Sequence, residues 1–419
     1  MSHSKDFKNK FFFIIPILFL LSLFLSVLYG EDTLGGAKYD YFYHEKYFTL
    51  FSENFYKTFS EYGNNFEVRN SPIFYIFFSF FVKLGIEIEN LKYVHLLVII
   101  PLSIFFIKCL NLKYSNIEKK TQAYLISILF LSPTVRSLCA WPYPFLWAIC
   151  FFLISIFYFL KFQKSNSSKQ KIKYSIFNII FLALSSYITP NFSVFAIYFF
   201  YFFFQNFKFS KELFFLILIN LILALPAIYF SILKDFYFLK NEVYLINNYI
   251  KYNPANKIII ITSIIFFFFI PYISIENLKK KIYKLKILNR TIIFLILFIL
   301  LNIFFFNFSK GAGGGIFFHI SQYLINNSSI LFIVFICSLF IFKFHEMLNL
   351  NNFLLFIILI LYNPQFTIYY KYFDPLLFFL LLFLFQFHKI INLNLISKKF
   401  IMLYLFFLFI NFGKNLIAY

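Results

Sequence analysis

Long apolar runs separated by short basic segments constrain this chain more than any other feature of its sequence. Runs of about 17–25 apolar residues have the length that an α-helix needs to cross the hydrocarbon core of a bilayer. Of the 419 residues, 61% are hydrophobic and 13% are charged, whereas about 25% of the residues of soluble domains are charged. The sequence therefore predicts an all-α fold, a polytopic transmembrane helical bundle.

We expect about thirteen helices in a single integral-membrane domain that covers residues 1–419. Residues 1–29 form the first transmembrane helix, residues 30–71 an acidic first extracytoplasmic loop, and residues 72–419 the remaining helices. The short run 72–85 is expected not to cross fully, because its crossing would place the next basic loop outside the membrane. The predicted spans are 11–29, 93–112, 121–133, 143–161, 174–190, 191–207, 212–232, 258–275, 291–308, 327–343, 352–363, 374–388 and 400–417.

The formal net charge of +21 arises mainly from lysines in the short segments between the apolar runs. Cytoplasmic loops of membrane proteins carry such an excess of basic residues, so the charge predicts topology and not binding to nucleic acid. With the N-terminus inside, residues 30–71 face the outside and residues 276–290 face the cytoplasm. Four cysteines show no paired spacing, and no metal-binding motif is present. For cofactors we predict none, with a divalent metal as the alternative.

The first extracytoplasmic loop carries the clearest chemical signal, because seven of the chain's 17 acidic residues lie between Gly30 and Pro72. Asp40 and His44 are four residues apart, which places both on one face if this stretch is helical. A carboxylate held at the membrane surface is suited to act as a general base on a hydroxyl. Asp32, directly after the first helix, is the rival candidate. The alternative is a solvated acidic loop without a catalytic role.

Three cations near predicted outside turns are candidate phosphate-binding residues. Arg69 precedes Pro72, a residue type favoured in the first turn of a helix. Arg136 lies in a predicted outside turn at 134–142, and Lys371 lies in a tyrosine-rich segment. The guanidinium fork of arginine matches the geometry of a phosphate group. The alternative for each is an ordinary cation at the membrane interface.

Two further segments are noted for their residue types. Five residues from Gly311 to Gly315 form a glycine-rich stretch in a chain with ten glycines, which favours either a connector or a close backbone approach. Asp374 is expected to cap the helix that follows it.

These motifs resemble those of the GT-C superfamily of polyprenol-phosphate-sugar-dependent glycosyltransferases. The family's D-E-x-F-H element is similar to Asp40–His44, in which a tyrosine replaces the glutamate. Its H-P-P-L-Y-Y element resembles Asn70–Tyr75 without the histidine and the first proline. Its late R-Y-x-x-P element is similar to Lys371–Pro375.

The resemblance implies a membrane enzyme of the cell envelope, with its active site on the extracytoplasmic face of the inner (plasma) membrane. Its partners would be a polyprenyl-phosphate-linked sugar donor, a glycan or glycolipid acceptor, and membrane lipids. A first-loop acid, Asp40 or Asp32, with His44 beside it, would deprotonate the acceptor hydroxyl, and the sugar would transfer with inversion. Arg69, Arg136 and Lys371 would bind the donor phosphate.

Three other classes remain open from the sequence. A transporter or flippase for lipid-linked saccharides would carry charged residues inside its helices at mid-depth, and the sequence shows almost none. An O-antigen ligase or polymerase would place its charged residues on a late outside loop, whereas the acidic residues of this chain come early. A non-enzymatic membrane scaffold is the third alternative.

Overall fold

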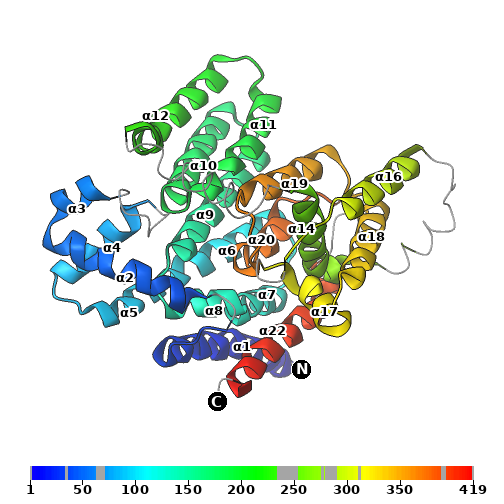
Figure 1. Ribbon diagram of the computed structural model, residues 1–419, viewed down its shortest axis with the longest axis horizontal. Coiled ribbons are helices and arrows are strands. Elements are labelled where there is room, and N and C mark those ends of the chain that lie inside the picture. The colour runs from blue at the N-terminus through cyan, green and yellow to red at the C-terminus, as the bar shows by residue number, and fades with distance from the viewer. Residues whose placement is uncertain are drawn as a thin grey trace. The chain divides into compact units, whose positions relative to one another are not determined.

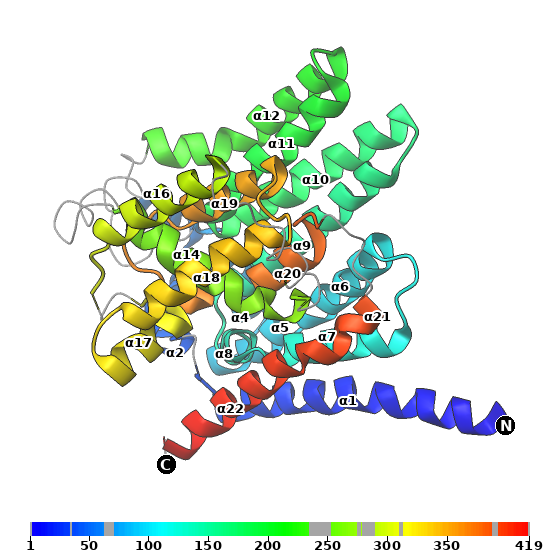
Figure 2. The same cartoon turned by 90° about the vertical axis from the view of Figure 1, so that its right-hand side faces the viewer.

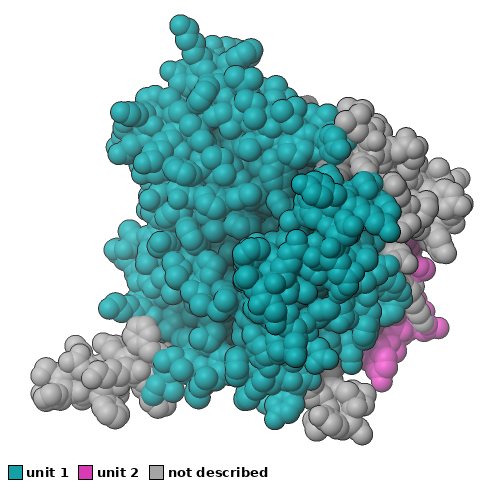
Figure 3. All heavy atoms as spheres, turned by 90° about the vertical axis from the view of Figure 1, so that its left-hand side faces the viewer, with its two compact units in different colours: residues 1–241, 403–419 teal, residues 242–402 magenta. Residues whose placement is uncertain are grey.

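The computed structural model describes residues 2–33, 36–62, 71–233, 253–274, 278, 290–309, 313–387 and 393–417. Within these ranges the secondary structure is helical throughout, apart from an isolated bridge between Gly313 and Ile368. The all-α prediction is therefore confirmed. The chain divides into two compact units, Met1–Asn241 with Leu403–Tyr419, and Glu242–Met402, which Figure 3 colours teal and magenta.

Unit 1 is organised around α9, which packs between α6 and α10 and buries most of its length. Helix α1 lies alongside α7 and α8, as Figures 1 and 2 show. The described helices of unit 1 are α1 (Ser2–Tyr29), α2 (Ala37–Glu53), α3 (Phe55–Glu61), α4 (Ile73–Lys83), η1 (Ile88–Asn90), α5 (Leu91–Leu96), α6 (Ile99–Lys113), α7 (Lys119–Leu131), α8 (Pro133–Ala140), α9 (Pro144–Lys164), α10 (Ser168–Ile188), η2 (Pro190–Val194), α11 (Phe195–Phe207), α12 (Lys211–Leu233) and, for the most part, α22 (Ile401–Ile417).

Unit 2 is built around α14 (Pro254–Phe269), which contacts most of the other helices of the unit. This helix begins with a proline, and the Asn253 side chain accepts a hydrogen bond from the Ala255 N–H, so its first turn is capped. Its side chains are nearly all buried. The other helices are η3 (Ile270–Tyr272), α16 (Arg290–Phe304), α17 (Gly315–Ile325), α18 (Ser329–Phe344), α19 (Leu350–Tyr362), η5 (Tyr370–Tyr372), α20 (Leu376–Phe383), α21 (Leu393–Ile396) and η6 (Ser397–Phe400).

Each of the thirteen predicted spans contains a helix, but fewer of these helices have the length of a full membrane crossing. Among the described residues, four continuous helical stretches are long and apolar enough: Ile88–Lys113, Pro144–Lys164, Lys211–Tyr229 and Pro254–Tyr272. A fifth is obtained if α7 and α8, bent by 59° at Ser132, together form one broken span. The chain therefore has the helices of a membrane protein, with four or five candidate spans.

The segment after the first loop begins a short helix at the position that its sequence predicts. Pro72 is the N-cap residue of α4, so the predicted helix start is confirmed. Helix α4 has 11 residues. At 1.5 Å per residue it extends only about 16 Å, whereas the hydrocarbon core is about 30 Å thick. This length agrees with the prediction that the run 72–85 does not cross by itself.

The predicted outside turn at 134–142 is wrong, because residues 133–140 form the helix α8 and all eight of them are buried. Pro133 occupies the first helical turn, and the Ser132 hydroxyl accepts a hydrogen bond from the Val135 N–H at 3.1 Å. The polar residues of α8 suggested a solvated loop, but two of them, Arg136 and Ser137, bind partners inside the protein.

We expect the first loop and the basic segments between the helices to face opposite sides of the membrane, as the charge pattern predicts. Of the four free cysteines, only Cys337 is exposed. In a Cys337→Ser background, cysteine introduced at the exposed Lys57 should react with a membrane-impermeant maleimide from outside intact cells. Cysteine at the exposed Lys169 should react only after permeabilisation. Labelling of both positions from the same side would contradict the topology.

Candidate active site

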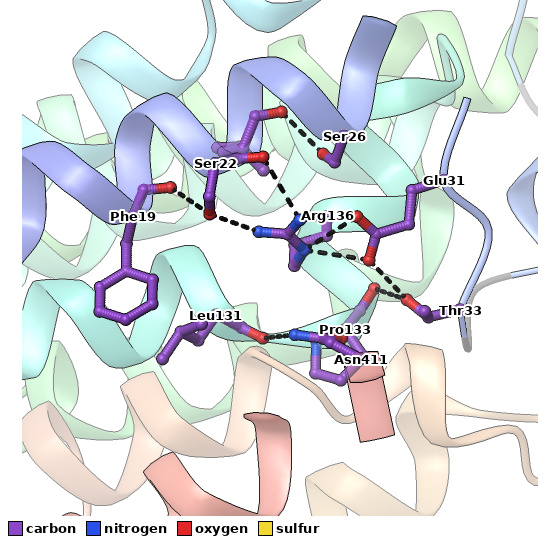
Figure 4. Close-up of polar contacts among 10 residues, drawn as sticks. Phe19, Ser22, Ser26, Glu31, Thr33, Leu131, Pro133, Arg136 and Asn411 are labelled. Atoms are coloured by element: carbon purple, nitrogen blue, oxygen red, sulfur yellow. Dashed lines mark hydrogen bonds and ion pairs between the residues drawn. The ribbon is translucent and has the colours of Figure 1, made fainter. Parts of the chain in front are cut away.

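Helix α8 carries an arginine whose whole guanidinium group is bound inside unit 1. Arg136 Nε donates to both carboxylate oxygens of Glu31, at 3.0 and 3.1 Å, and Nη2 donates to Oε2 at 2.6 Å. Nη1 donates to the Ser22 hydroxyl at 2.8 Å, and Nη2 also lies 3.3 Å from the Ser22 carbonyl oxygen. Figure 4 shows the guanidinium between α1 and the carboxylate that follows it. The exposed fractions of the Arg136 and Glu31 side chains are 11% and 7%, so the ion pair is largely removed from water.

Side chains from other segments bind backbone carbonyls on both sides of the break between α7 and α8. The Asn411 side chain of α22 donates to the Leu131 carbonyl at 2.9 Å, and the Thr33 hydroxyl donates to the Pro133 carbonyl at 3.4 Å (Figure 4). Buried carbonyl groups need such partners, because an unpaired one costs about 1–3 kcal/mol. The bend is therefore held from two sides.

A histidine fixes the other end of α8. The Trp147 indole N–H donates to His95 Nδ1 at 3.0 Å, and His95 Nε2 lies 2.8 Å from the Leu138 carbonyl oxygen. Because an indole can only donate, Nδ1 must accept and Nε2 must carry the proton. His95 is fully buried and both of its ring nitrogens are bonded, so its role is to hold α8 in place.

Asp32 lies next to the ion pair and is held by the following residue of α8. Its Oδ1 accepts hydrogen bonds from the Ser137 hydroxyl and, at 3.2 Å, from the backbone N–H of Ala37, the first residue of α2. Neither bond uses Oδ2. The carboxylate is half-buried. Consecutive residues of α8, Arg136 and Ser137, thus hold the consecutive acids Glu31 and Asp32.

Asp40 and His44 both lie on α2, so the condition for their placement on one face is met. Asp40 lies in the first turn and is half-buried, where a negative charge interacts favourably with the helix dipole. His44 is buried, and its Nδ1 is hydrogen-bonded to the Tyr75 hydroxyl of α4. Its ring stacks on that of Tyr75 with centroids 5.5 Å apart and meets the Tyr143 ring at 5.2 Å. His44 therefore belongs to an aromatic cluster between α2, α4 and the start of α9.

Burial perturbs several ionisable groups on α2, among them Glu45 and Tyr41. Burial raises the pKa of the Glu45 carboxyl above its usual value, and the nearby Glu89 carboxylate raises it further. Burial also raises the pKa of the Tyr41 hydroxyl, to which Glu45 contributes in the same direction. Both shifts favour the neutral form.

The remaining predicted residues lie elsewhere. Arg69 is outside the described residues, as are Asn70 of the same motif and most of the predicted cytoplasmic segment 276–290. Lys371 lies in η5 of unit 2, with its Nζ 5.9 and 5.8 Å from the ring centroids of Tyr369 and Tyr372. The expected cap by Asp374 is not found, because α20 begins at Leu376 with Pro375 as its N-cap residue and without a side-chain cap.

Unit 2 brings the glycine-rich stretch and the Lys371 segment together. The Gly314 N–H donates to the Ile368 carbonyl at 2.9 Å. A Cβ atom on Gly313 would lie 2.4 Å from the same oxygen, and Gly313 has a φ of +95°. A side chain at position 313 would therefore be excluded. The backbone that the glycine-rich stretch approaches closely is the chain's own segment before Tyr369.

Sequence reasoning missed the roles of Glu31, Ser22 and Ser137, which hold the site together. One signal was available: Glu31 is an acid directly after an apolar helix, and Arg136 is one of only three arginines. Within the part of the chain that the structure describes, no three His, Cys, Asp or Glu residues form a group that could hold a metal. What the site does offer is an oriented carboxylate beside a neutralised arginine.

No protein-family model, curated protein or solved structure matches this chain. Its function is therefore argued from the residues and their geometry.

We expect removal of Arg136 to be strongly destabilising, because it would leave the Glu31 carboxylate buried without a partner. Breaking a buried ion pair on one side costs about 3–5 kcal/mol. Arg136→Met and Glu31→Gln should each lower the thermal unfolding midpoint in detergent, and the double variant should lose less than the two single losses combined. Lys57→Ala, at an exposed position, is the control. Strictly additive losses would show that the two side chains do not interact.

We expect Glu45→Gln to stabilise the protein at neutral pH but not at low pH. Because the folded-state pKa of Glu45 is raised, its contribution to stability is present below the unfolded-state pKa and is lost as the pH rises through the folded-state pKa. A glutamine stays neutral throughout. The unfolding midpoints of Glu45→Gln and of the exposed control Glu53→Gln should be compared with wild type from pH 4 to pH 8. A Glu45→Gln effect of the same size at every pH would be the contrary result.

Proposed function

We propose that this protein is a membrane glycosyltransferase that moves a sugar from a polyprenyl-phosphate donor to a glycan or glycolipid acceptor of the cell envelope. The acceptor hydroxyl attacks C1 of the sugar, the bond from C1 to the phosphate oxygen breaks, and the configuration inverts. A carboxylate that follows the first helix takes the proton of the hydroxyl, and the polyprenyl phosphate leaves. The active site lies on the extracytoplasmic side of the inner membrane.

The observation that carries the proposal is the fixed orientation of Asp32. Two donors, the Ser137 hydroxyl and the Ala37 N–H, bind Oδ1, and the half-buried carboxylate is therefore held in one direction. A general base must be positioned before the reaction and must stay ionised. Asp40, in the first turn of α2, is the second candidate for the base, and His44 supports α2 through Tyr75.

Arg136 is a positioning residue in this proposal. Each of its three guanidinium nitrogens donates to Glu31 or Ser22, so the residue fixes α8 and, through Ser137, Asp32. Of the other two cations of the predicted set, either Arg69 or Lys371 is then the candidate for the donor phosphate. A cation near the bridging oxygen stabilises the charge that develops on the leaving phosphate.

A second candidate function is the transport of a lipid-linked saccharide across the membrane. It is favoured by one observation, the broken pair α7 and α8 with the buried Arg136 in its second part. Broken helices and buried charges at membrane depth are typical of transporters. The pairing of Arg136 with Glu31 weakens this alternative, since the charge is already neutralised within the protein.

We expect Asp32→Asn to lower sugar transfer by about 10²–10⁴-fold, which is the usual contribution of a general base. The assay would use the full chain in proteoliposomes, a panel of synthetic polyprenyl-phosphate hexoses and an envelope lipid extract as the acceptor. Asp40→Asn should reduce transfer less, and Glu53→Gln, at an exposed position of α2, should leave it unchanged. Donor binding should survive in Asp32→Asn, because the base does not contact the phosphate.

The alternatives predict different results in the same experiment. If Asp40→Asn abolishes transfer and Asp32→Asn does not, the base is Asp40 and the enzyme class stands. If wild-type protein moves the labelled lipid across the bilayer without transferring its sugar, the protein is a transporter. Wild-type transfer in both variants would rule out a first-loop base.

A further inference from the structure

Unit 1 contains an apolar pocket that the proposed reaction does not use. Its volume is about 600 Å³, and its lining comes from the start of α4, the end of α10, η2, the start of α11 and the second half of α12. The size is within the range of about 300–1,000 Å³ that is usual for small-ligand sites. The few polar groups in its lining include Ser186 and Asn220.

Small residues create the hollow between α10 and α12. Ala183 of α10 and Ala224 and Ala227 of α12 face it, where larger side chains would fill it. The Tyr187 hydroxyl of α10 donates to the Leu223 carbonyl of α12, and this bond ties the two walls together. Pro226 has no N–H and so removes one hydrogen bond from this part of α12. The pocket is thus a feature of the packed helices.

Lining residues on three elements are exposed: Ile73 of α4, Pro190 and Ser193 of η2, and Pro226 and Ala227 of α12. Helix α12 is a candidate span, yet only 11% of its apolar window is buried within the protein. In a membrane, an exposed apolar face of a spanning helix contacts hydrocarbon chains.

The charge pattern places the pocket in the outer half of the bilayer. Lys208 and Lys211 flank the start of α12 and are predicted to be cytoplasmic. Ala224 is 13 residues further on, which is about 20 Å along a helix. That distance lies beyond the midplane of a hydrocarbon core about 30 Å thick.

We propose that this pocket binds one acyl chain of a glycerophospholipid in the outer leaflet. The lining is mostly apolar, and the exposed apolar face of α12 beside it meets the acyl chains of the surrounding lipid in a bilayer. Because the bound chain comes from hydrocarbon and not from water, the shape of the pocket decides the occupancy.

The bound chain would also contact the helix that supports α2. Ile73 and Ile76 of α4 line the pocket, while Tyr75 of the same helix binds His44. The lipid therefore contacts the helix that also carries Tyr75 of the aromatic cluster. This inference stands independently of the sugar-transfer reaction.

The test is photo-crosslinking of the full chain in nanodiscs. The probe is a phosphatidylglycerol with a diazirine near the end of one acyl chain, and the labelled peptides are mapped by mass spectrometry. We expect labelling of the pocket-facing residues of α10 and α12. Ala224→Phe should reduce it to background, because the ring fills the pocket. Leu225→Phe, at the neighbouring exposed position outside the lining, is the matched control and should leave the labelling unchanged.

Each outcome decides the proposal. Equal labelling of the pocket in wild type and Ala224→Phe would overturn it, as would labelling by a polyprenyl-phosphate diazirine probe alone. If Ala224→Phe does not fold, Ala183→Phe fills the pocket from α10 and gives the same comparison. Loss of labelling together with intact sugar transfer would support the pocket and leave the proposed function untouched. Absence of sugar transfer in wild type, with labelling retained, would reject the function and keep the pocket.

Discussion

Taking an arginine out of water costs several kcal/mol unless an opposite charge and further hydrogen bonds compensate for the lost hydration. In this protein the compensation for Arg136 comes from Glu31 and from Ser22, which lie more than a hundred residues away in the sequence. The rest of this region depends on this replacement of water by Glu31 and Ser22 as partners of Arg136. Helix α8 is buried with its arginine neutralised, and Glu31 ties the end of α1 to α8 in addition to the packing of α1 on α7 and α8. The position of Asp32 depends on both contacts, because Asp32 follows Glu31 in the chain and accepts a hydrogen bond from Ser137, the residue after Arg136.

A broken helix requires partners for the carbonyl groups that the break leaves without their usual donors. Leu131, the last residue of α7, has such a group, and the Asn411 side chain donates to it. The Thr33 hydroxyl adds a bond to the Pro133 carbonyl in the first turn of α8. The partners come from α22 near the end of the chain and from the segment after α1, so the bend between α7 and α8 ties both ends of unit 1 to its middle. Such a bend is a rigid feature, because its hydrogen bonds come from separate elements.

Local sequence signals predicted the parts of the fold that depend on neighbouring residues. The apolar runs yielded a helix in every expected place, and Pro72 starts α4, because both effects act within a few turns of chain. The segment 134–142 was misread for the opposite reason. A stretch with Thr, Arg and Ser looks like a solvated turn, and only the acid that follows α1 shows why it is buried. In the same way, the approach of Gly313 to Ile368 joins two segments that no local pattern connects.

The sequence singles out the acidic residues between Gly30 and Pro72 but not their arrangement. Within that stretch, α2 places Asp40 and His44 on one helix, as their spacing required. Spacing along a helix says only which residues share a face. It does not say how deeply each side chain is buried or which groups surround it. His44 is drawn into an aromatic cluster, Asp40 stays near the surface, and Asp32 lies before the helix, where its carboxylate accepts the first N–H of α2. A carboxylate in that position is oriented by the helix start and by Ser137 at once. Asp32 is thus oriented by contacts with two separate elements, α2 and α8.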